Sequence, residues 1–98
     1  MIKLVHGGRE YICDDAKQLI AAGVPESVAN NAELEYKSLL VRKERDNLLQ
    51  ETDWTQVVDS PLPDDKKAEF AVYRQALRDI PQTYSDPDLV VWPEKPTI

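Results

Sequence analysis

The fold is decided by residues 45–81, which read RDNLLQETDWTQVVDSPLPDDKKAEFAVYRQALRDIP. The second half of this stretch has apolar side chains at intervals of three and four residues, the period of an amphipathic helix. These side chains are Phe70, Tyr73, Leu77 and Ile80. We expect the helix to begin at Asp64 and Asp65, whose carboxylates suit a helix N-terminus, and to end at Pro81.

A longer helix is predicted upstream, because neither proline nor glycine occurs between Pro25 and Gln50. Leu34, Val41 and Leu48 recur in it every seven residues. Residues 57–63 follow as VVDSPLP, a connection that cannot remain helical. The pattern predicts an antiparallel helix hairpin in which Leu34, Val41 and Leu48 pack within the chain. Packing against a second copy stays open as the alternative, since the row is too short to establish a coiled coil.

The flanking segments complete an α+β, mainly helical fold. Residues 1–13 place two strand-like runs around Gly7-Gly8, which predicts a β-hairpin. Its buried face is expected to carry Ile2, Leu4, Tyr11 and Cys13. Residues 14–22 form a short helix closed by Gly23, and the proline-rich segment after Pro81 is extended. We interpret residues 1–98 as a single domain, with a β-hairpin at 1–13, a helical part at 14–44 and a distinct module at 45–98.

Composition and net charge disfavour several classes of partner. The chain has 12 Lys and Arg against 18 Asp and Glu, a net charge of −6, and no basic patch. This charge disfavours nucleic acid and anionic membranes. The single Cys13 cannot form an internal disulfide, and no segment resembles a signal peptide or a membrane span, so we expect folding in a cytoplasm.

Reactive side chains are scarce. One histidine and one cysteine cannot supply the usual nucleophile–base pairs or a closed zinc site, and the acidic pairs are explained by helix caps and turns. We therefore expect no catalytic residues, no metal site, no cofactor and no enzymatic activity.

Two tryptophans lie outside the helical stripes, Trp54 in the predicted inter-helix loop and Trp92 in the proline-rich tail. They either cover the ends of the helix hairpin or anchor another protein, because tryptophan is enriched among interface hot spots. Arg74 and Arg78 lie one turn apart on one helix face and are within reach of Asp46, Asp53 or Asp59 across the hairpin. Such ion pairs are more often structural than binding determinants.

Five blocks in the second half occur in a recognisable order: Arg45-Asp46 with Leu48-Leu49, TDWTQ at 52–56, DSPL at 59–62, YRQALRDIP at 73–81 and VVWP at 90–93. With these blocks, residues 45–96 closely resemble the C-terminal region of tailed-phage tail assembly chaperones, some of which are labelled tail fibre assembly proteins. The chain departs from the family pattern at Val57-Val58, where members often have Leu-Pro.

The resemblance implies a non-enzymatic phage or prophage protein that binds a tail or tail-fibre polypeptide during virion assembly in the cytoplasm of the bacterial host. The alternative is a minor structural component that stays in the tail tip or fibre base of the virion. No catalytic residue carries over from the family. The candidate protein-interaction residues are Trp54, Trp92, Tyr84, Arg74, Arg78 and Val91.

Overall fold

The computed structural model describes residues 1–98, which form two compact units, 1–40 and 41–98. The boundary between the units falls inside the long helix α2 (Glu26–Glu51). The predicted α+β, mainly helical fold class is confirmed: a β-hairpin and a short helix precede two long helices. None of these helices combines the length and the apolarity needed to cross a bilayer.

The first unit opens with the predicted β-hairpin. Strands β1 (Ile2–His6) and β2 (Arg9–Cys13) pair antiparallel, in a register that sets Ile2 opposite Cys13 and His6 opposite Arg9. Gly7 and Gly8 make the turn with φ angles of 58° and 78°, a region that side chains with a Cβ avoid. The glycine pair therefore sets the turn and, through it, the register.

A short helix follows, α1 (Ala16–Ala21), whose N-terminus is capped by the Asp15 side chain accepting from the Gln18 amide. The core of this unit is formed by Ile2, Ala16, Leu19, Val24 and Ala29. Leu4, Tyr11 and Cys13 pack half-buried against this core, which confirms the predicted face of the hairpin. A two-stranded hairpin is marginal in water, and this packing on helical residues supplies the burial it needs.

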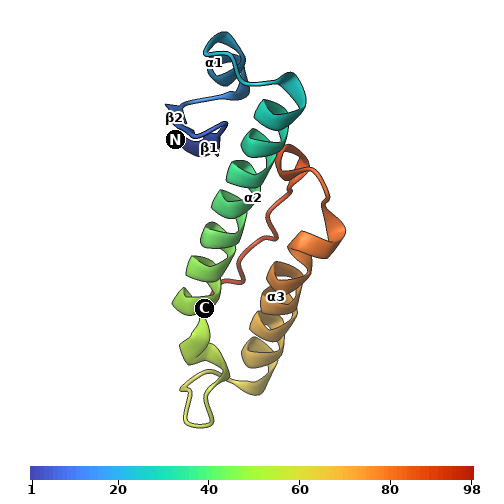
Figure 1. Ribbon diagram of the computed structural model, residues 1–98. Coiled ribbons are helices and arrows are strands. Elements are labelled where there is room, and N and C mark those ends of the chain that lie inside the picture. The colour runs from blue at the N-terminus through green and yellow to red at the C-terminus, as the bar shows by residue number, and fades with distance from the viewer. The chain divides into compact units, whose positions relative to one another are not determined.

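The second unit is a helix hairpin. It consists of the end of α2 from Val41, a 3₁₀ turn η1 (Asp53–Gln56), helix α3 (Asp64–Thr83), a 3₁₀ turn η2 (Pro87–Leu89) and the C-terminal tail. Figure 1 shows α3 returning antiparallel to the end of α2. The buried core residues are Leu62, Phe70, Tyr73, Leu77 and Ile80, against which Val41, Leu48, Leu49, Tyr84 and Val90 pack. The predicted apolar stripe of α3 is thus the centre of this core.

The expectation that Pro81 ends the second helix is wrong, because α3 continues through Pro81 to Thr83. Proline has no N–H, so the bond to the carbonyl of Leu77 is missing. The Tyr84 amide nevertheless donates to the carbonyl oxygen of Ile80 at 2.9 Å and closes the last turn. The fixed φ of proline is itself helical, and the cost is small this close to a helix end.

The tail after Leu89 contains neither helix nor strand, as the prolines predict. It runs beside the helices of this unit: Val90 packs on the core, and Lys95 forms an ion pair with Glu51 near the end of α2. Residues 94–97 also line a shallow hollow with Lys66 and Glu69 at the start of α3. The tail is therefore part of the packed unit.

Candidate partner-binding site

Two threonines close the end of α2 and the turn that follows it. The Thr52 hydroxyl donates to the carbonyl oxygens of Leu48 at 2.8 Å and Leu49 at 3.2 Å. The Thr55 hydroxyl donates to the carbonyl oxygen of Thr52 at 2.7 Å. Both threonines are buried. Their hydroxyls satisfy carbonyls that a helix end leaves without partners, so the chain can turn sharply inside a buried setting.

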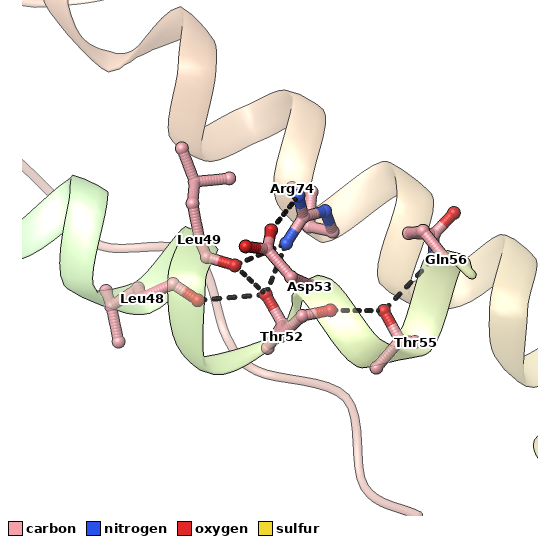
Figure 2. A network of polar contacts seen from close by, with 7 residues as sticks. All are labelled: Leu48, Leu49, Thr52, Asp53, Thr55, Gln56 and Arg74. Carbon is pink, nitrogen blue, oxygen red and sulfur yellow. Dashed lines mark hydrogen bonds and ion pairs between the residues drawn. The ribbon is translucent and has the colours of Figure 1, made fainter. Parts of the chain in front are cut away.

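Arg74 joins this turn to the middle of α3 (Figure 2). Its residue exposure is only 7%, and its Nη1 donates to the Leu49 carbonyl at 2.5 Å and to Thr52 Oγ1 at 2.9 Å. Its Nη2 lies 2.7 Å from Asp53 Oδ1. A guanidinium has several donors in a planar fork and suits such a set of separate acceptors. Because the Asp53 side chain is 62% exposed, the two bonds at Nη1 matter at least as much as the ion pair.

The turn is held from a second direction by Gln56. Its Nε2 donates to the Lys67 carbonyl at 3.0 Å and to Thr55 Oγ1 at 3.2 Å. Trp54 lies between Asp53, which Arg74 holds, and Gln56 in the sequence. Its ring makes a tilted contact with Phe70, with ring centroids 6.5 Å apart. Trp54 remains 41% exposed. The indole therefore has one part against the core and another part open to solvent.

Beyond the turn, the loop presents two valines to solvent. Val58 is 100% exposed and Val57 is half-exposed, and the Ser60 amide donates to the Val57 carbonyl at 3.1 Å. We call Trp54, Val57 and Val58 the loop tip. The turn before the two valines is held by the bonds of Arg74 and Gln56, and the valines themselves follow it on a loop that the Ser60–Val57 bond turns.

A second apolar feature surrounds Trp92. A shallow groove of about 340 Å³ lies where the tail meets the end of α3. It is lined by Ala76, Asp79, Ile80, Thr83, Tyr84, Val91, Trp92 and Pro93. Three of the predicted interaction residues, Tyr84, Val91 and Trp92, therefore meet in one place. Trp54 lies in the turn η1 instead, and Arg74 lies on α3 and contacts the start of that turn.

The two arginines differ in their surroundings. Arg74 contacts Asp53, one of its three predicted partners, through Nη2 alone. Its Nη1 donates to the Leu49 carbonyl instead of to the same carboxylate. Arg78 is exposed and forms no hydrogen bond or ion pair. The roles of Thr55 and Gln56 were not predicted, because their bonds to the carbonyls of Thr52 and Lys67 follow from the path of the loop and leave no pattern in the sequence.

The electrostatics of this unit are mild. Burial raises the pKa of the Tyr73 hydroxyl, and the positive charge of Lys95 partly offsets this effect. The hydrogen bond to Glu51 raises the pKa of the Lys95 ammonium. No group of three or more His, Cys, Asp or Glu side chains has the geometry of a metal site. The features that the second unit offers are therefore apolar contact surfaces.

Comparison with known proteins assigns this unit. Residues 38–97 match the sequence model of a family described as phage tail assembly chaperone protein. The match spans more than half of the chain and nearly all of the helix-hairpin unit, so the chain belongs to this family. Its general role is in phage tail assembly. We found no match among curated proteins, and none among solved structures.

Proposed function

We propose that this protein is a non-enzymatic assembly factor that binds a phage tail or tail-fibre polypeptide in the host cytoplasm and leaves before the virion is complete. The observation that supports the proposal is the loop tip. Val58 is fully exposed on a loop whose base is held by the buried Arg74, so an apolar surface projects from an anchored base. A preorganised loop loses little conformational entropy when it binds.

The groove at Trp92 supplies a second apolar surface for the same purpose. Trp92 is 36% exposed and Val91 is 71% exposed, although both lie beside buried residues of α3. Aromatic and aliphatic side chains of this kind are typical interface anchors. A chaperone needs such surfaces to shield the apolar segments of an unassembled chain.

The second candidate function is a minor structural component of the tail tip or fibre base. The observation in its favour is the tail after Val90, which is extended and makes no backbone hydrogen bonds within the chain. An extended segment with free N–H and C=O groups can add to the edge of a neighbouring sheet. Under this proposal, the tail would remain paired with a virion protein.

Quantitative mass spectrometry separates the two proposals. The protein is measured in gradient-purified particles and in the lysate from which they came, relative to a major tail protein. Abundance in the lysate with absence from particles supports the transient factor, and a fixed whole-number ratio in particles supports the structural component.

Co-expression tests binding itself. The full chain is produced with each tail and tail-fibre polypeptide of the same phage, and complexes are identified by size-exclusion chromatography with mass detection. A complex that a Trp92→Ala variant weakens, while its circular dichroism stays unchanged, supports direct contact. If no tail polypeptide forms a complex, the proposed binding function is wrong.

A further inference from the structure

The segment that joins the two helices of the second unit is acidic when the helix residues at its two ends are included. Residues 51–65 contain Glu51, Asp53, Asp59, Asp64 and Asp65, but neither lysine nor arginine. The next two residues are Lys66 and Lys67, and the segment remains net negative when they are included. The apolar loop tip, Trp54, Val57 and Val58, lies within this segment.

Part of this charge is neutralised inside the protein. Glu51 pairs with Lys95 and Asp53 pairs with Arg74, while Lys66 is engaged by Glu69. Asp59, Asp64 and Asp65 have no cationic partner. Asp64 and Asp65 lie in the first turn of α3, where the helix dipole favours them. Asp59 follows directly after the exposed Val58 and has neither a pairing nor a capping role.

The exposed apolar side chains of the loop tip thus lie beside the unpaired carboxylate of Asp59, on a loop whose base is held by Arg74 and Gln56. The surface that complements it has an apolar recess bordered by lysine or arginine side chains. We propose that the loop tip docks into such a basic-rimmed apolar recess on the tail or tail-fibre polypeptide. This inference rests on the proposed function and names the chemistry of the partner's surface.

The same charges disfavour other occupants. A second copy would bring Asp59 and its neighbours against carboxylates of the same sign, unless it used a different face. An anionic membrane or a nucleic acid would be repelled by the loop in the same way. A basic, partly apolar polypeptide surface complements both the apolar side chains and the charge of the loop.

The test uses the full chain and the tail polypeptide recovered in the co-expression experiment. Affinity is measured at about 0.05 M and about 0.3 M NaCl, because salt screens interactions between exposed charges. Asp59→Lys should weaken binding about tenfold at low salt and much less at high salt. The matched control is Glu35→Lys, an exposed position in the first unit with the same change of net charge, and it should leave the affinity within about twofold.

The apolar part is tested separately. The double variant Val57→Ser/Val58→Ser should weaken binding at least about tenfold at both salt concentrations. Its control is Val72→Ser, which removes a valine that is also largely exposed but lies on α3. Overlapping peptides that cover the partner's sequence should show binding only where Lys or Arg flanks apolar residues.

The outcomes distinguish this inference from the proposed function. Binding that neither Asp59→Lys nor the valine pair affects would overturn the docking of the loop tip and leave the assembly function standing. Loss of binding with Val57→Ser/Val58→Ser, but no response to Asp59→Lys or to salt, would overturn the basic rim. Concentration-dependent self-association abolished by the valine pair would identify a second copy as the occupant. Absence of any complex would overturn both proposals.

Discussion

Arg74 Nη2 lies 2.7 Å from Asp53 Oδ1, and this contact joins the middle of α3 to the first residue of the turn that follows α2. The other arm of the same guanidinium donates to the Leu49 carbonyl and to Thr52 Oγ1. One buried side chain therefore holds the end of one helix, the turn and the second helix together (Figure 2).

Replacing Arg74 with methionine should lower the free energy of unfolding by about 3 kcal/mol, because the Leu49 carbonyl and the Thr52 hydroxyl lose a charged donor in a buried setting. Arg78→Met is the matched control, since Arg78 lies one turn further along α3, exposed and without a partner. It should change stability by less than about 0.5 kcal/mol. Chemical denaturation followed by circular dichroism measures both, and equal losses would refute the bracing role of Arg74.

Thr52→Val keeps the size of the side chain but removes its hydroxyl. That hydroxyl donates to carbonyls at the end of α2 and accepts from Arg74, so its loss should cost about 1 to 2 kcal/mol. The exposed Thr97 gives a control for the same chemical change, and Thr97→Val should be nearly neutral. If Thr52→Val is equally neutral in urea unfolding, the buried hydrogen bonds contribute nothing net.

Val90 and Val91 are neighbours in the tail with opposite surroundings. Val90 is half-buried and packs on the core of the second unit, whereas Val91 is 71% exposed. Val90→Ala should therefore destabilise the protein by roughly 1 kcal/mol, and Val91→Ala by much less. Thermal unfolding of the two variants checks this difference. A reversed order would show that the tail is not packed in solution as described.

Alkaline pH should destabilise the second unit through Tyr73. Burial raises the pKa of its hydroxyl above the ordinary 10.0, so the folded state holds the proton more tightly than the unfolded state does. The stabilisation is complete below pH 10 and is lost as the pH rises through the folded-state pKa. Tyr73→Phe cannot ionise, and its melting temperature should fall less steeply above pH 10 than that of the wild type. Parallel curves would assign the alkaline transition to other groups.

The path of the backbone could be predicted better than the contacts of individual side chains. Gly7-Gly8 indicated the hairpin turn, and the apolar period of 70–80 indicated the buried face of α3, as the structure confirms. The helix end expected at Pro81 is wrong, because a proline near the C-terminus of a helix is accommodated when the amide of Tyr84 still reaches the carbonyl of Ile80. The candidate residues Trp54, Trp92, Tyr84 and Val91 remain predictions as binding residues, and the structure shows where they lie.

Local sequence predicts most of the helices and strands and the apolar face of α3, because glycine turns, helix caps and apolar periodicity act over a few neighbouring residues. It does not predict that Leu34, in the same row as Val41 and Leu48, is 45% exposed. The tertiary structure selected Asp53 as the acid that Arg74 reaches, because Asp46, Asp53 and Asp59 are all within the range of a long side chain. It also decided that Trp54 rests partly on Phe70 while Val58 is fully exposed. Burial depends on what distant segments cover, and that depends on how the helices and the tail pack together.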